Sequence, residues 1–96
     1  MFFIMNVDVQ IYISEFKRFF NQNPDDLKNL IPINLKDEFY EVVSNIAELN
    51  EKEGREIPLT QKQLIEICVK LNGGPKKKKM VQSFIMETKF GNIFLN

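Results

Sequence analysis

The stretch TQKQLIEICVKLNGGPKKKKM, residues 60–80, carries the strongest fold signals of this chain. Thr60 and Gln63 have the spacing of a capping box, in which each side chain accepts a hydrogen bond from the other residue's free backbone N–H at a helix start. Apolar residues then recur three and four positions apart, as on the buried face of a helix: Leu64, Ile65, Cys68 and Leu71. The turn NGGP, residues 72–75, ends the pattern. The stretch therefore predicts an amphipathic helix from about residue 60 to residue 71.

Four consecutive lysines follow that turn: Lys76, Lys77, Lys78 and Lys79. We refer to them as the lysine run. A helix over residues 76–88 would place five residues on one face: Met80, Val81, Phe84, Ile85 and Thr88. Two strands, MVQSFIMETK and NIFLN, would instead pair around a tight turn at Gly91. The pattern leaves both structures open for this segment, and the apolar end NIFLN favours a docked final strand.

In the first third of the chain, residues 6–13 fit either a strand or a helix, and residues 14–22 fit a helix. In NVDVQIYI, residues 6–13, apolar and polar residues alternate, which is typical of a strand. A helix that begins near Val9 is the competing interpretation. Residues 14–22, SEFKRFFNQ, then place Phe16 and Phe20 at helical spacing together with Phe19. We expect an amphipathic helix here, with a start that extends back into the uncertain segment.

Two more helices are expected before the capped one. Asn23 followed by Pro24 is a helix-start signal, and a short apolar helix follows it. Asn34 is expected to cap a longer helix over about residues 35–53, which Gly54 would end. The apolar stripe of this longer helix is expected to consist of Leu35, Phe39, Val42, Val43, Ile46 and Leu49.

The order of these elements is that of a winged-helix domain. An acidic helix, a short extended segment at residues 56–59, the capped helix, a glycine-containing turn, a basic segment and a final strand follow one another. In a winged-helix domain the basic third helix enters the major groove of DNA and strands follow it. We therefore expect one small domain over residues 1–96, mainly α with minor β (α+β). Its expected architecture is winged-helix-like, with a C-terminal strand or hairpin.

The composition excludes several kinds of chemistry. The 96 residues include no histidine, which excludes Ser–His and Cys–His nucleophile systems and imidazole metal sites. One cysteine, Cys68, cannot form an internal disulfide or a thiolate metal cluster, so we expect a reducing cytoplasm. No apolar run approaches the roughly 20 residues of a membrane-spanning helix. The apolar start MFFIM lacks the basic region of a secretory signal.

The net charge is zero, yet the charges are unevenly distributed. Residues 1–58 hold 11 acids and 6 bases, a net charge of −5, and residues 59–96 hold 2 acids and 7 bases, a net charge of +5. Such a division presents one basic face to an anionic partner. That partner is expected at the basic C-terminal third, from about residue 73.

The lysine run is the first candidate for this basic face. Near the start of a third helix its lysines would meet phosphates, and Gln82 and Ser83 would be the polar residues able to reach base edges. These six residues form the predicted nucleic-acid-binding site of a non-enzymatic regulator. The alternative is that the run is only a solvated loop, because like charges in a row repel one another. The protein would then be a protein–protein interaction adaptor or accessory protein, as a monomer or a homodimer.

Other conspicuous residues have simpler structural explanations. Phenylalanines at helical spacing are expected in the core rather than stacked on bases. Cys68 shares an apolar stripe, so we expect a buried, inert thiol. The acidic pairs at residues 25–26 and 37–38 lie in first helical turns, where the helix dipole favours them without a metal. We therefore expect no catalytic residue, no metal site and no cofactor.

Three segments together resemble a known group of proteins: YISEFKRFFNQNPDDLKNLI (residues 12–31), LTQKQLIEICVKL (residues 59–71) and TKFGNIFLN (residues 88–96). Over most of its length the chain is similar to small uncharacterised proteins of marine T4-like phages that infect cyanobacteria. The resemblance implies a small regulatory or accessory protein made in the cytoplasm of an infected bacterium. It implies no activity and transfers no functional residue.

Overall fold

The computed structural model describes residues 2–55 and 57–87, with side chains from residue 9 onward. This part of the chain forms five α-helices and two short 3-10 turns. The helices are α1 (Phe2–Gln22), α2 (Pro24–Leu30), α3 (Lys36–Lys52), α4 (Gln61–Leu71) and α5 (Lys78–Glu87), and the turns are η1 (Ile33–Leu35) and η2 (Pro75–Lys77). None of the described residues lies in a β-strand, so the described chain is all-α.

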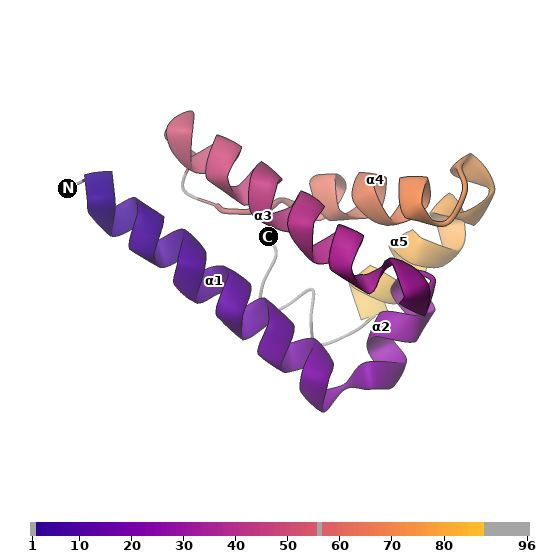
Figure 1. Ribbon diagram of the computed structural model, residues 1–96. Coiled ribbons are helices and arrows are strands. Elements are labelled where there is room, and N and C mark those ends of the chain that lie inside the picture. The colour runs from indigo at the N-terminus through magenta and orange to yellow at the C-terminus, as the bar shows by residue number, and fades with distance from the viewer. Residues whose placement is uncertain (1, 56, 88–96) are drawn as a thin grey trace.

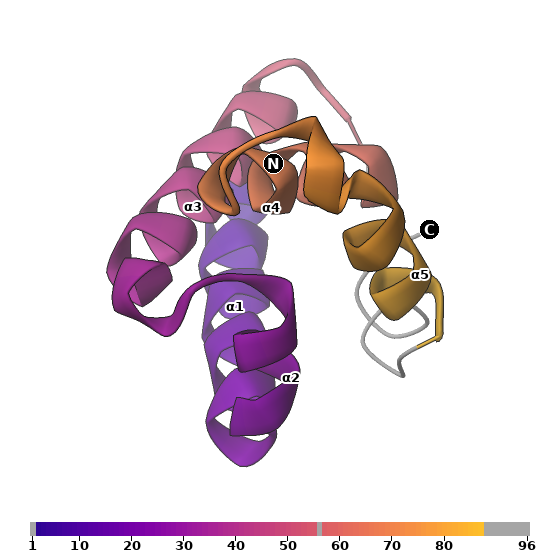
Figure 2. The same ribbon diagram turned by 90° about the vertical axis from the view of Figure 1, so that its right-hand side faces the viewer.

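The helices are arranged so that α5 forms an outer edge of the molecule. α1 and α3 lie side by side and run in opposite directions, and α4 returns along α3 (Figure 1). α5 packs on α4 and on α2. In the turned view, α5 stands on the opposite side of α4 from α3 (Figure 2). The glycine turn and the lysine run therefore lie at one end of the packed helices rather than inside them.

Three phenylalanines form the centre of the core between α1 and α3. Phe16, Phe20 and Phe39 are at most 2% exposed. The Phe16 ring centroid lies 5.3 Å from that of Phe20 and 5.6 Å from that of Phe39, within the range of attractive aromatic pairs. Phe19 is half-buried and packs against the same cluster. The prediction that the phenylalanine stripe belongs to the core is confirmed.

The predicted strand at residues 6–13 is wrong, because these residues belong to α1. Val9, Phe16 and Phe20 are buried and lie seven and four positions apart, on one face of a helix. A strand would have placed Val9 and Ile11 on the same face, but Ile11 is 55% exposed. The competing interpretation, a helix, is correct, although the helix begins at Phe2 and not near Val9. Packing against α3 selects the helical face over the local alternation.

The predicted α+β class and the winged-helix-like architecture are also wrong, because the residues that the structure describes contain no sheet. Residues 57–60, predicted to include an extended segment, form an irregular connection between α3 and α4. A wing requires strands, and the described ranges supply none.

The segment after the glycine turn was predicted to be either a helix or a hairpin, and residues 78–87 form a helix, α5. Val81 and Ile85 are fully buried and lie four positions apart, on one face of α5. A strand would have placed Ser83 on that same face, but Ser83 is exposed. The first strand of the predicted hairpin is therefore wrong over residues 80–87. The predicted final strand, residues 92–96, lies outside the described residues.

The predicted helix starts are confirmed at α4 and wrong at α3. Thr60 Oγ1 accepts a hydrogen bond from the Gln63 backbone N–H at 3.1 Å, and Gln63 Oε1 accepts one from the Thr60 backbone N–H at 3.0 Å. Asn34 does not cap α3, because it lies in η1 and Leu35 occupies the N-cap position without a side-chain bond. Asn23 is the N-cap residue of α2, but its side-chain amide donates to a backbone carbonyl of α1 at 2.9 Å.

The buried face of α3 is rotated from the predicted apolar stripe. Phe39 is fully buried, as predicted, but Leu49 is 54% exposed and its neighbour Asn50 is 3% exposed. The Asn50 Nδ2 donates to Gln63 Oε1 at 2.8 Å and to the Pro58 carbonyl oxygen at 2.8 Å, and Gln63 Nε2 donates to Asn50 Oδ1 at 3.2 Å. These bonds satisfy a buried polar group, and they join the end of α3 to the start of α4.

Candidate nucleic-acid interface

A glycine turn sets the direction in which α5 leaves α4. Gly73 and Gly74 have φ angles of +97° and +131°, in the region that favours glycine. The Gly74 N–H donates to the Val69 carbonyl oxygen at 2.9 Å and closes the end of α4. Pro75 then begins η2, which continues directly into α5. The turn therefore places the lysine run at the beginning of α5.

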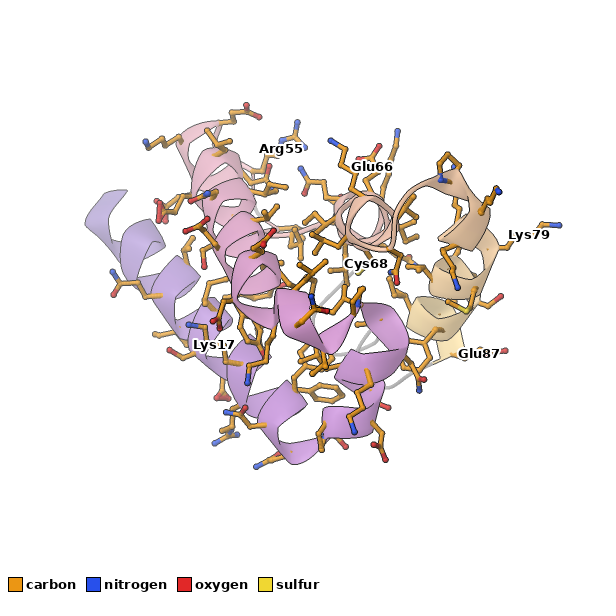
Figure 3. All side chains as sticks on the ribbon, turned by 45° about the vertical axis from the view of Figure 1, so that its right-hand side comes forward. Lys17, Arg55, Glu66, Cys68, Lys79 and Glu87 are labelled. Carbon is orange, nitrogen blue, oxygen red and sulfur yellow. The ribbon has the colours of Figure 1, made fainter. Side chains whose placement is uncertain are left out.

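The lysine run lies at an exposed corner of the molecule. Lys76 and Lys77 are in η2, and Lys78 and Lys79 begin α5. All four are exposed, and none forms an ion pair with another described residue. The Lys79 side chain points away from the body of the protein (Figure 3). Four ammonium groups are therefore accessible from solvent within one short segment.

The charges at the start of α5 oppose its dipole. The N-terminal end of a helix carries a partial positive charge, so acids stabilise its first turn and lysines destabilise it. α2 and α3 both have two acids in their first turns, at residues 25–26 and 37–38. α5 has no acid in its first turn. A bound anion would reduce the repulsion within the lysine run and would offset the unfavourable positive charge at the helix start.

The structure places Gln82 and Ser83 on different sides of α5. Both are exposed, and consecutive residues of an α-helix point about 100° apart. Gln82 follows Lys78 by one turn, and both line a hollow between α4 and α5. Ser83 follows Lys79 by one turn, on the side that faces outward. The structure therefore brings Lys78 and Gln82 together and separates Ser83 from that pair.

Two hollows run along the seam between α4 and α5. Their volumes are about 360 and 390 Å³, and both are lined by Ile65, Glu66 and Lys78. Lys62 lines the larger hollow and Lys70 lines the smaller. These two lysines were absent from the predicted site. Their spacing of four residues on either side of Glu66, on the wet face of a predicted helix, is the sequence signal that could have found them.

The described residues keep the division of charge that the sequence predicts. Residues 57–87 hold six lysines and two glutamates, a net charge of +4, whereas residues 2–55 hold ten acids and six bases, a net charge of −4. In space, the positive part consists of α4, η2 and α5, which pack on one another (Figure 2). The six lysines of residues 57–87 thus belong to one structural unit, which we call the α4–α5 unit.

Cys68 is a core residue, as predicted. Its side chain is 0% exposed, and burial raises the pKa of the thiol to about 12. The thiol is therefore protonated at neutral pH, which makes it a poor nucleophile. Among residues 2–55 and 57–87, no three His, Cys, Asp or Glu side chains come together as metal ligands would.

A separate apolar hollow lies between α3 and α4. Its volume is about 310 Å³, and four apolar side chains line it: Val42, Ile46, Ile67 and Leu71. Polar atoms at its rim come from α4, from Gln63, Glu66 and Lys70. The lining of this hollow is more apolar than that of the two hollows between α4 and α5, and it lies on the other side of α4 from the lysine run.

None of the helices in the described part of the chain combines the length and the apolar character that a membrane span requires. No family model, no curated protein and no solved structure matches the chain. Function is therefore argued from the α4–α5 unit itself.

Proposed function

We propose that this protein is a non-enzymatic, cytoplasmic regulator or accessory protein that binds nucleic acid through the α4–α5 unit. The lysine run would contact backbone phosphates, and Lys62 and Lys70 would add to the positive potential along the same unit. Phosphate contacts of this kind provide most of the affinity of non-specific nucleic-acid binding.

The observation that supports this proposal is the position of the lysine run at the N-terminal end of α5, where the helix dipole makes positive charge unfavourable. Four exposed lysines at a helix start reduce the stability of that helix, and none is compensated by an ion pair with a described residue. Stability therefore gives no reason for these charges to be there. Binding of a polyanion does, because phosphate oxygens would pair with the lysines and would lie at the positive end of the helix dipole.

The test is fluorescence anisotropy with labelled oligonucleotides at several salt concentrations. If the four lysines each meet a phosphate, the slope of log affinity against log salt is about −3 to −4, which means a loss of about 60- to 250-fold over a fourfold rise in salt. Changing Lys76, Lys77 and Lys79 together to alanine should remove most of this dependence. Changing Lys28, Lys36 and Lys52 together to alanine is the matched control, because it removes the same charge from other exposed positions.

Two results would reject the proposal. One is no binding at low salt by the unchanged protein. The other is equal weakening by the two triple variants, since this would mean that net charge, and not the lysine run, determines binding. Circular dichroism of both variants shows whether the helices remain.

A second candidate function, a protein–protein interaction adaptor that forms a homodimer, is favoured by the apolar hollow between α3 and α4. Half-buried Ile46 contributes to the lining of this hollow. Light scattering on the purified protein should then show a dimer that Ile46→Asp converts to a monomer. Leu49→Asp is the control, because Leu49 is exposed on the same helix and does not line the hollow. A strict monomer at high protein concentration contradicts this candidate.

A further inference from the structure

Asn72, the residue before the two glycines of the turn, bridges the ends of two helices. Its side-chain Nδ2 donates one hydrogen bond to the Leu30 carbonyl oxygen at 2.6 Å and another to the Cys68 carbonyl oxygen at 2.7 Å. Leu30 is the last residue of α2, and Cys68 lies in the last turn of α4. Carbonyl oxygens in the last turn of a helix need donors from outside that helix. The two N–H groups of one amide thus join α4 to α2, and we call this contact the Asn72 latch.

The Asn72 latch holds together the two helices on which α5 rests. α5 packs on α2 and on α4, and the glycine turn that directs it follows Asn72 immediately. Within that turn the Gly73 N–H donates to the Lys70 carbonyl oxygen at 3.1 Å, and the Gly74 N–H donates to the Val69 carbonyl oxygen at 2.9 Å. The position of α5 therefore depends on the latch at both of its supports.

The sequence at the latch is chemically labile. Asn72 and Gly73 are the one Asn-Gly pair among the 96 residues. In such a pair the backbone nitrogen of the glycine can attack the side-chain carbonyl carbon of the asparagine, because glycine has no Cβ to obstruct the approach. The new C–N bond closes a succinimide ring, and the side-chain NH2 group leaves as ammonia with the proton of the glycine N–H. Water then opens the ring at either carbonyl, which leaves aspartate or isoaspartate at residue 72.

The product has the opposite hydrogen-bonding character to the amide. A carboxylate accepts hydrogen bonds and donates none, so its oxygens would face the carbonyl oxygens of Leu30 and Cys68 where amide hydrogens lie in the intact latch. The carboxylate would also bring negative charge to the C-terminal ends of α2 and α4, where the helix dipoles are already negative. Isoaspartate adds a carbon atom to the main chain directly before the turn. Either product therefore opposes the closed latch.

From these observations we infer that Asn72 is a deamidation site, and that its conversion releases the latch and weakens the packing of α5 on α2. In the folded protein the Gly73 N–H and the Asn72 amide both donate hydrogen bonds, so the reaction proceeds from molecules in which the turn has opened. Each conversion then disfavours closing, which makes the change a one-way switch directly before the lysine run. This inference is independent of the proposed nucleic-acid binding.

The first experiment locates the modification. The full chain is incubated in mildly alkaline buffer, either folded or unfolded in urea, and peptide mapping by mass spectrometry follows every asparagine. In both states Asn72 should react before any other asparagine, and the folded protein should react at least about tenfold more slowly, because only its open fraction reacts. Equal rates in the two states would overturn the inference, as would a faster reaction at another asparagine.

The second experiment measures the release of the latch. Hydrogen exchange of the Gly74 backbone N–H is followed by NMR in protein deamidated during the incubation and separated by ion exchange, and in Asn72→Asp. Exchange should be at least about tenfold faster than in the unchanged protein. Asn29→Asp is the matched control, because it adds the same charge in the last turn of α2 at an exposed side chain. Unchanged exchange in the deamidated protein, or equal acceleration in Asn29→Asp, contradicts a release of the latch.

A further variant decides the matter if Asn72→Asp does not fold. Asn72→Ala removes both donors of the latch without adding a charge. Its Gly74 N–H should again exchange faster than in the unchanged protein. Exchange as slow as in the unchanged protein would show that the Asn72 amide does not hold the turn, and the inference would then be wrong.

Discussion

Helix α3 begins with Lys36 and then has two acids, Asp37 and Glu38, in its first turn, whereas α5 begins with Lys78 and Lys79 and has none. Each helix buries one apolar face against the same core and exposes the other, although α3 has 17 residues and α5 has 10. The acids of α3 lie at the positive end of the helix dipole and stabilise it, while the lysines of α5 lie at the same end and destabilise it. The comparison teaches that local stability explains the charges of one helix start and fails to explain those of the other.

The largest expected effect concerns the apolar anchor inside each first turn. Phe39 anchors α3 and contacts the rings of Phe16 and Phe20, whereas the smaller Val81 anchors α5. Phe39→Ala should reduce the free energy of unfolding by about 3–5 kcal/mol. Val81→Ala, which removes two carbon atoms, should reduce it by about 1–3 kcal/mol. Urea unfolding followed by circular dichroism measures both values. Leu49→Ala is the exposed control, and equal losses for Phe39 and Val81 would contradict an unequal anchoring of the two helices.

An intermediate effect is expected at the start of α4, which is stabilised by hydrogen bonds instead of charge. Thr60→Ala removes the acceptor of the Gln63 N–H and should reduce the free energy of unfolding by about 1 kcal/mol. Thr60→Ser keeps the acceptor and should retain most of the stability. Because no charge is involved, added salt should leave the difference between these two variants unchanged. A difference that vanishes in salt would mean that the cap acts electrostatically.

The smallest effects on stability distinguish the two charged starts directly. Asp37→Asn should reduce the free energy of unfolding by about 0.3–1 kcal/mol, and Lys79→Glu should raise it by a similar amount at low salt. Lys79 is suited to this test because its side chain points away from α4 (Figure 3). Lys79→Glu should also weaken nucleic-acid binding, so that stability and affinity change in opposite directions. A Lys79→Glu protein that is both less stable and equally able to bind would show that Lys79 neither destabilises α5 nor contacts the ligand.

The parts of the fold that the sequence predicted correctly are those determined by neighbouring residues. Thr60 and Gln63 hydrogen-bond to each other within one turn, so these two residues are sufficient to predict where α4 begins. The segment at residues 6–13 could not be predicted in the same way, because alternation and helical spacing were both present. Its helical form depends on which side chains α3 covers, and that choice is made by residues about 30 positions away.

The candidate site shows the same limit. The lysine run was visible in the sequence, and its place at the start of a helix was one of two predicted structures. The helical spacing of Lys62 and Lys70 was visible in the sequence, but their place beside Lys78 depends on the packing of α4 on α5, which is a tertiary contact. The separation of Gln82 from Ser83 could have been predicted for either structure, because consecutive residues point about 100° apart on a helix and to opposite faces of a strand.

The buried thiol of Cys68 gives this protein a natural reporter of its own motions. Since the chain has one cysteine and its side chain is 0% exposed, an alkylating reagent can react only after the core between α4 and its neighbours opens. The rate of labelling therefore measures how often α4, the helix before the glycine turn, opens. A ligand that stabilises the packing of the α4–α5 unit would slow this labelling without contacting the cysteine. The reactivity of the buried Cys68 sulfur would then report ligand binding at the surface.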